Sequence, residues 1–102
     1  MQFRYNMSDG FPAMTTKKLA FNAVKAELLW FISGSSDVKE LQKLGCRIWD
    51  QNAQADYWKP KARFEGDLGR IYGVQWRNWQ TTDGRAIDQL HEVIERIKKN
   101  PY

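Results

Sequence analysis

The chain has 102 residues, a formal net charge of +4 and hydrophobic residues at 42% of its positions. This length fits one small domain or part of a larger one, and the apolar content excludes disorder throughout. One cysteine, Cys46, and one histidine, His91, exclude an intrachain disulfide and a zinc cluster. Basic and acidic residues are intermixed, which argues against a dedicated nucleic-acid-binding protein and would suit at most a small anionic ligand.

No targeting or membrane segment is visible in the sequence. Met1–Asp9 has no apolar run of the kind found in signal peptides, and the apolar stretch near Leu28–Ile32 is too short to span a bilayer. We therefore expect a cytoplasmic protein without a membrane partner. Five Trp, four Tyr and five Phe are many for this length, which predicts a ligand cleft or a surface that meets a partner.

The first half of the chain predicts one strand and two helices. Alternation of large residues predicts a strand over Gln2–Met7. A helix should follow from about Lys17 to Ile32, with Thr15-Thr16 as its N-cap and Gly34 as its stop. Its apolar arc is wide, so we expect burial on most sides. Asp37 and Glu40 resemble a capping box for a short helix over 37–44.

The second half is less regular. A turn or short helix is expected near Gln51–Ala55, and Asp56–Gly66 is interpreted as a loop or insertion. Leu68–Trp79 is aromatic and punctuated by glycines, which predicts irregular or short-stranded structure. After a turn at Asp83-Gly84, apolar residues at helical spacing predict a helix from about Ala86 to Lys99.

Glu27 is a candidate for chemistry because it lies within the apolar arc of the first helix. Burying a carboxylate costs free energy unless it is paired or protonated, and desolvation raises the pKa of such a group toward that of a general acid or base. The alternative is a structural glutamate bonded to Lys25 or Arg77.

The aromatic residues offer a second candidate site. Together they could form a stacking wall for a flat ligand, although an ordinary core is the simpler interpretation. The residues concerned are Trp49, Tyr57, Trp58, Tyr72, Trp76 and Trp79. Arg77 could hold a phosphate or make a structural ion pair. Cys46 is interpreted as a small, half-buried residue and His91 as a surface residue.

Five segments occur in an order that resembles the thymidylate synthase family, which includes the pyrimidine hydroxymethylases. They are GFPAMTTKK, ELLWFISG, IWD, DLGRIYGVQWRNW and DGRAIDQL with a later NP. The resemblance covers most of the chain. It implies an α+β fold in which helices pack on a piece of the family's β-sheet. Residues 1–102 would form a single partial domain, with the stretch around 56–66 as an insertion.

The resemblance also implies roles for individual residues. The family converts dUMP to dTMP with 5,10-methylenetetrahydrofolate as one-carbon donor and reductant, and it needs no metal. Glu27 matches the glutamate that organises proton transfer, and Trp49 matches a tryptophan that packs against folate and the reaction centre. Tyr72 matches a tyrosine near the nucleophile. Lys17 matches a lysine near the folate's glutamate tail, whereas Asn52 stands where many relatives have a second folate-contacting tryptophan.

Parts of the family's site are not found in these residues. The nucleophilic cysteine of a Pro-Cys-His motif and the arginines that bind the nucleotide phosphate have no match here. Cys46 does not correspond to that nucleophile. Without the thiolate no covalent adduct can activate the nucleotide, so we expect this polypeptide to be inactive alone.

Three functions therefore stay open. The chain is interpreted first as a fragment of thymidylate synthase that another polypeptide completes, and its expected protein partner is a second copy in a homodimer or a complementing C-terminal chain. It could instead be a non-catalytic binding or interaction module derived from the fold. The third possibility is a fragment of a dUMP or dCMP hydroxymethylase.

Overall fold

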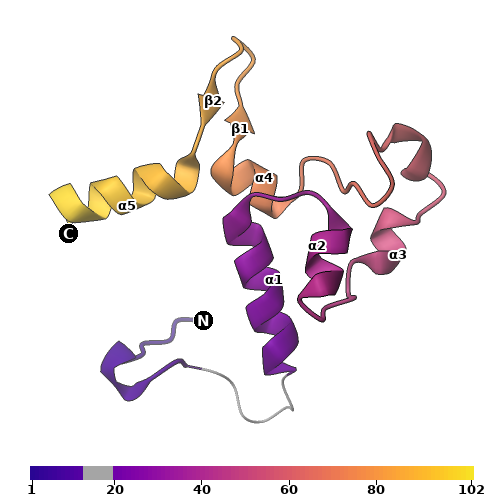
Figure 1. Cartoon of the computed structure of the whole chain (residues 1–102). Coiled ribbons are helices and arrows are strands. Elements are labelled where there is room, and N and C mark those ends of the chain that lie inside the picture. Colours follow the sequence, from indigo (N-terminus) through magenta and orange to yellow (C-terminus); the bar gives the residue numbers. More distant parts are fainter. Residues whose placement is uncertain (13–19) are drawn as a thin grey trace.

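The structure is a computed structural model that describes residues 1–12 and 20–102. The α+β class is confirmed: within the described residues, short helices are combined with one small antiparallel sheet. The elements are η1 (Met7–Asp9), α1 (Phe21–Ser33), α2 (Val38–Lys43), α3 (Asp50–Ala53), η2 (Lys59–Lys61), α4 (Tyr72–Arg77), β1 (Trp79–Gln80), β2 (Ala86–Ile87) and α5 (Gln89–Lys99) (Figure 1).

Helix α1 is the central element, and α2 and α4 pack against it. It ends at Gly34, whose left-handed φ of 77° confirms the predicted stop. The predicted N-cap Thr15-Thr16 lies outside the described residues. The expectation that α1 is buried on most sides is wrong. Ala26, Trp30 and Phe31 are buried, whereas one side of the helix exposes Phe21, Val24, Leu28, Leu29 and Ile32.

The prediction of irregular structure over Leu68–Trp79 is wrong for its central part, which forms α4. Gly73 is buried where α4 meets the C-terminal end of α1. A Cβ atom at Gly73 would lie 2.9 Å from the carbonyl oxygen of Phe31 and 3.1 Å from its Cα. The missing side chain therefore lets the two helix backbones approach closely, and this contact outweighs the poor helix propensity of glycine.

The small core lies between α1, α2 and the segment that follows α2. Trp30, Leu41 and Cys46 are almost fully buried there. The Trp30 indole N–H donates a hydrogen bond to the Asp37 carbonyl at 3.1 Å, which ties α1 to the start of α2. Asp37 caps α2 as predicted, through Oδ1, which accepts from the Lys39 backbone N–H. Cys46 is thus more deeply buried than expected.

Asp67 is a buried charged residue that sequence patterns did not single out. Its side chain is 1% exposed and forms a two-pronged ion pair with Arg63, with both N–O distances at 3.1 Å. The Ser36 hydroxyl and the Gly69 backbone N–H donate to the same carboxylate at 2.7 and 2.9 Å. The hydrogen bond from Arg63 holds the pKa of Asp67 well below its usual range, with smaller contributions from Gly69 and Ser36 that burial opposes.

Backbone contacts around Asp67 anchor the loop over 56–66. Val38 donates its backbone N–H to the Gly66 carbonyl at 2.9 Å, and Leu68 donates to the Ser36 carbonyl at 2.8 Å. The Trp58 indole N–H donates to the Asp67 carbonyl at 2.7 Å. The loop contains the short η2 turn, and its C-terminal end is held against the start of α2.

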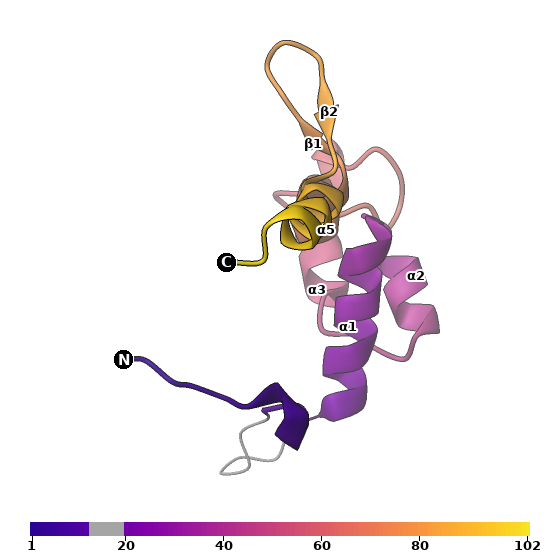
Figure 2. The ribbon, with the colours of Figure 1, turned by 90° about the vertical axis from the view of Figure 1, so that its left-hand side faces the viewer.

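The β1–β2 hairpin follows α4, and it extends beyond the helices (Figures 1 and 2). Its turn at Asp83-Gly84 is confirmed, with Gly84 at a φ of 87°. The last helix begins at Gln89 and not at Ala86, because Ala86 and Ile87 pair with β1. Asp88 then caps the helix, since its carboxylate accepts from the His91 backbone N–H.

The predicted strand over Gln2–Met7 is wrong. The chain has no regular structure there before η1, and no described strand pairs with it.

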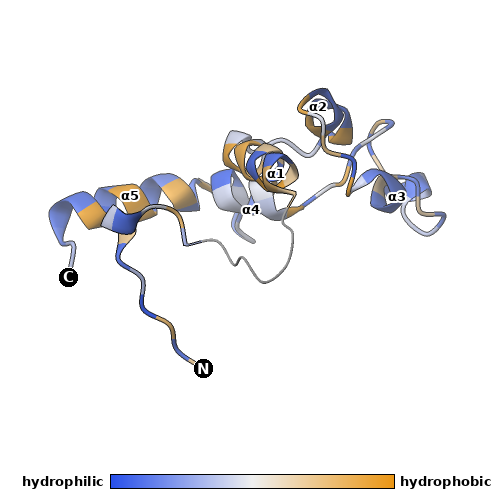
Figure 3. Cartoon of the chain, turned by 90° about the horizontal axis from the view of Figure 1, so that it is seen from below, coloured by the Kyte–Doolittle hydropathy of each residue, from blue (hydrophilic) through white to orange (hydrophobic). Residues whose placement is uncertain are grey.

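Large apolar surfaces remain uncovered. The accessible surface is 8598 Å², against about 6,000 Å² expected for a compact chain of this mass. The radius of gyration is 16.7 Å, against about 13 Å for a compact chain of this length. Helix α5 has no buried residue and exposes Val93, Ile94 and Ile97. Apolar residues run along both α1 and α5 in Figure 3.

The close approach of α1 and α4 predicts the effect of Gly73→Ala. An added methyl group would push against the Phe31 backbone, so we expect the free energy of unfolding to fall by about 1 kcal/mol or more. Alanine normally stabilises a helix relative to glycine by about 1 kcal/mol, so the sign of the change is diagnostic. Urea unfolding followed by far-UV circular dichroism measures it, and a gain in stability would contradict the close contact.

The Asp67 ion pair predicts a second change. Asp67→Asn replaces the buried carboxylate with an amide that has one acceptor oxygen for the donors of Arg63, Ser36 and Gly69, so the free energy of unfolding should fall by at least about 2 kcal/mol at neutral pH. Asp83→Asn is the matched control, because Asp83 also pairs with an arginine, Arg85, but at the exposed hairpin turn. We expect a much smaller change there, because solvent screens an exposed ion pair.

The ion pair also makes the difference in unfolding free energy between wild type and Asp67→Asn depend on pH. Because the folded protein lowers the pKa of Asp67, its contribution is fully present above the ordinary aspartate pKa of about 3.9. The contribution is lost as the pH falls below that value toward the lowered pKa. Denaturant titrations should therefore show wild type and Asp67→Asn converging in acid, and a difference that stays constant would count against the ion pair.

Candidate active site

Glu27 and Trp49 are joined by a hydrogen bond. The Trp49 indole N–H donates to Glu27 Oε2 at 2.8 Å, and it links the middle of α1 to the residue that precedes α3. Both residues are half-buried. The alternative partners considered for Glu27 are not used, since Arg77 pairs with Asp88 at 3.0 Å and no ion pair joins Lys25 to Glu27. The contact holds one carboxylate oxygen in a fixed position beside an aromatic ring.

Tyr72 lies next to this pair at the start of α4. Its ring meets Trp49 edge to face, with centroids 6.2 Å apart, and meets Phe31 in the same way at 5.4 Å. About half of the Tyr72 surface is exposed, so the ring and its hydroxyl stay accessible from one side. The structure thus brings Glu27, Trp49 and Tyr72 together from three separate segments.

Trp49 and Asn52 share a small recess. It has a volume of about 200 Å³ and is also lined by Tyr57, Trp58, Leu68 and Ile71. Pockets that enclose a whole small molecule usually have about 300–1,000 Å³. The recess therefore fits the edge of a flat ring and not a complete folate. Asn52 is exposed at its rim, and Lys17 lies outside the described residues.

The six aromatic residues that could have formed one wall are divided between several places. Trp76 joins Tyr72 around Phe31, with a centroid separation of 5.5 Å from Phe31. Trp79 lies instead under the guanidinium of Arg70, which is 4.8 Å from the ring centroid. The six residues therefore do not form a single stacking wall, because α4 ends at Arg77 and Trp79 lies beyond it in β1.

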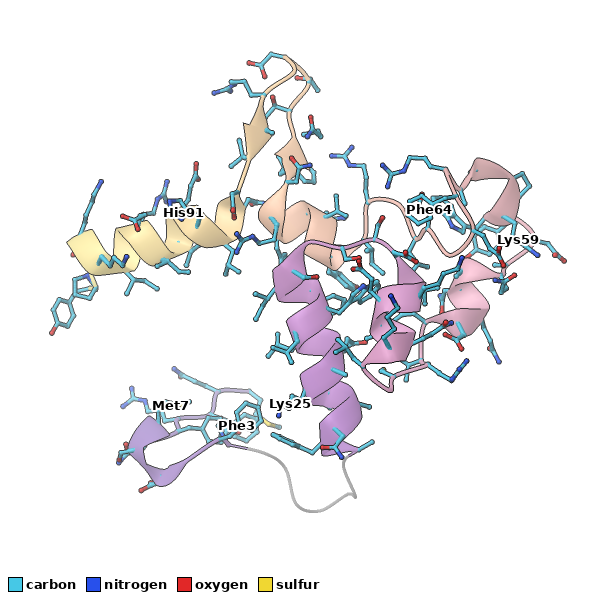
Figure 4. All side chains as sticks on the ribbon, viewed as in Figure 1. Phe3, Met7, Lys25, Lys59, Phe64 and His91 are labelled. Carbon is cyan, nitrogen blue, oxygen red and sulfur yellow. The ribbon has the colours of Figure 1, made fainter. Side chains whose placement is uncertain are left out.

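Other candidates for chemistry are excluded by their positions. Cys46 is 1% exposed within the core, where its thiol cannot reach a ligand. His91 is exposed on α5, as predicted (Figure 4).

Among the described residues, no group of three or more His, Cys, Asp or Glu side chains could hold a metal ion. No helix in that part of the chain is long and apolar enough to cross a membrane.

Sequence reasoning missed the ion pair between Asp67 and Arg63. The signal was weak: an aspartate between Gly66 and Gly69, four residues after an arginine, just beyond a segment interpreted as a loop. Hydrophobic periodicity carries no information about such a residue, because its burial depends on hydrogen bonds from the Ser36 hydroxyl and the Gly69 backbone N–H.

The geometry agrees with a comparison against known protein families. A family model described as thymidylate synthase matches residues 1–102, which is the whole chain. The match includes Glu27, Trp49 and Tyr72, whose side chains form one cluster in the structure. The chain belongs to the thymidylate synthase family.

Proposed function

We propose that this chain supplies one part of an active site that converts dUMP to dTMP. The observation that carries the proposal is the 2.8 Å hydrogen bond between Trp49 Nε1 and Glu27 Oε2 within the aromatic cluster. A carboxylate held in this way is pre-organised for proton transfer, because little conformational entropy is lost when the side chain is oriented in each turnover.

Glu27 would move protons through a bound water. Its Oε2 atom accepts from Trp49, whereas no described residue donates a hydrogen bond to Oε1. That second oxygen is thus available to hold a water molecule near the nucleotide. Tyr72 would contribute its accessible hydroxyl on the neighbouring side of the cluster.

Trp49 and Asn52 would contact the folate co-substrate. 5,10-Methylenetetrahydrofolate supplies the one-carbon unit and the hydride when it is bound. The recess beside Trp49 is lined by aromatic rings and matches the flat edge of such a molecule, while its small volume means that other residues must enclose the rest. We assign Lys17 to the folate's glutamate tail from its match to the family motif alone.

The nucleophile must come from residues beyond these 102, since Cys46 is buried and does not match the family's cysteine. The exposed apolar sides of α1 and α5 support a second polypeptide, either a homodimeric twin or a complementing C-terminal chain. We further propose that 1–102 act as one partial domain, with the anchored loop over 56–66 as an insertion, in a cytoplasmic enzyme.

Complementation tests the proposal. The chain is combined with a C-terminal thymidylate synthase chain that carries the paired arginines and the Pro-Cys-His motif, and dTMP formation from dUMP and methylenetetrahydrofolate is measured by chromatography. We expect activity in the mixture and none from either chain alone. Glu27→Gln should lower this activity by at least about 100-fold, because general acid–base groups contribute factors of this size.

Glu65→Gln is the matched control, because Glu65 is a carboxylate on the exposed loop, and its activity should equal that of wild type. Unchanged activity in Glu27→Gln would contradict the assigned role. A hydroxymethylated product from dUMP or dCMP would identify the hydroxymethylase alternative instead. Stable association without any product would favour the non-catalytic module.

A further inference from the structure

A basic groove lies away from the Glu27–Trp49 pair. It has a volume of about 620 Å³ and runs between the loop around η2 and the segment from α4 to β1. Its lining comprises Trp58, Lys61, Arg63, Asp67, Gly69, Arg70, Val74, Asn78 and Gln80. Phe64 and Lys59 mark the neighbouring loop in Figure 4. The groove shares Trp58 with the recess beside Trp49, and it contains none of the three catalytic candidates.

The charges in this groove do not cancel. Three cationic side chains line it, from Lys61, Arg63 and Arg70. Asp67 brings one negative charge, and its two carboxylate oxygens are both engaged by Arg63. The remaining charge is therefore about +2, carried by Lys61 and Arg70.

The arginine at position 70 is held in place by its neighbours. Its guanidinium lies over the Trp79 ring, and Nη2 donates to the Gln80 carbonyl at 3.4 Å. A side chain ordered in this way loses less conformational entropy when it binds an anion than a freely moving lysine does. The groove is thus partly pre-organised.

The position of Trp58, which forms the apolar wall of the groove, depends on a glycine. Gly69 has a φ of 68°, and a Cβ atom there would lie 2.7 Å from Cη2 of Trp58. The absence of a side chain lets the indole edge pack directly on the backbone, so the ring forms a firm apolar wall. Near the hairpin, the Gln80 side-chain amide donates to Asn78 Oδ1 at 2.8 Å, which leaves the side-chain nitrogen of Asn78 and the side-chain oxygen of Gln80 for a ligand.

We propose that this groove binds a phosphorylated small molecule, with its phosphate between Lys61 and Arg70 and its apolar part against Trp58. A phosphate monoester carries close to two negative charges at neutral pH, which matches the excess of +2, whereas a single carboxylate carries one. The volume falls within the range of small-molecule sites, which favours a compact ligand over a peptide.

Isothermal titration calorimetry of the 102-residue chain with phenyl phosphate and with inorganic phosphate tests the site. We expect saturable binding at one site for phenyl phosphate, and weaker binding of inorganic phosphate, which has no ring for Trp58. The double variant Lys61→Gln/Arg70→Gln should bind phenyl phosphate at least about tenfold more weakly, because a hydrogen bond to a charged group contributes at least this factor.

The matched control is Arg96→Gln/Lys98→Gln on α5, which removes the same charge from another surface. It should bind like wild type, and far-UV circular dichroism should show that both double variants keep the native helix content. Equal weakening in both double variants, or no weakening in the groove variant, would overturn the proposal. Single-stranded oligothymidylate that binds more tightly as it lengthens would also overturn it, in favour of a nucleic-acid surface.

Discussion

The buried carboxylate of Asp67 is the constraint on which the rest of the structure depends. It accepts hydrogen bonds from Arg63, Ser36 and Gly69, which belong to three different segments. Taking a carboxylate out of water costs several kcal/mol, so the arrangement is stable only while every partner is present. Its backbone neighbours extend the effect, because Trp58 and Leu68 are bonded on either side of the same residue. In a chain with so small a core, this polar centre takes over part of the positioning that packing normally provides.

The candidate active site and the basic groove both adjoin this centre. Leu68 reaches the core and lines the recess beside Trp49, while Arg63 and Trp58 line the groove. The loop over 56–66 is therefore a structural part of both regions, whatever its history in the family. The apolar sides of α1 and α5 have no such support from within the described residues. We propose that a second polypeptide packs on these surfaces.

The sequence predicted elements whose signals are local. Gly34, the Asp37 cap and the Asp83-Gly84 turn were found because one or two residues decide each backbone conformation. Helix α4 was missed because Gly73 counts against a helix locally and is required by a contact with Phe31 that the sequence does not show. The strand over Gln2–Met7 failed because alternation does not supply a pairing partner. Glu27 and Trp49 were singled out separately, but their hydrogen bond depends on how α1 meets the start of α3.

An NMR pH titration of the wild-type protein tests the central claim most directly. It follows the side-chain carboxyl carbon of Asp67 together with the indole N–H signal of Trp58, which is bonded to the Asp67 carbonyl. We expect that Asp67 stays ionised while the pH falls through the ordinary aspartate range, and that the Trp58 signal moves when Asp67 finally takes up its proton. Protonation of Asp67 at its ordinary pKa, with no response from Trp58, would contradict the account.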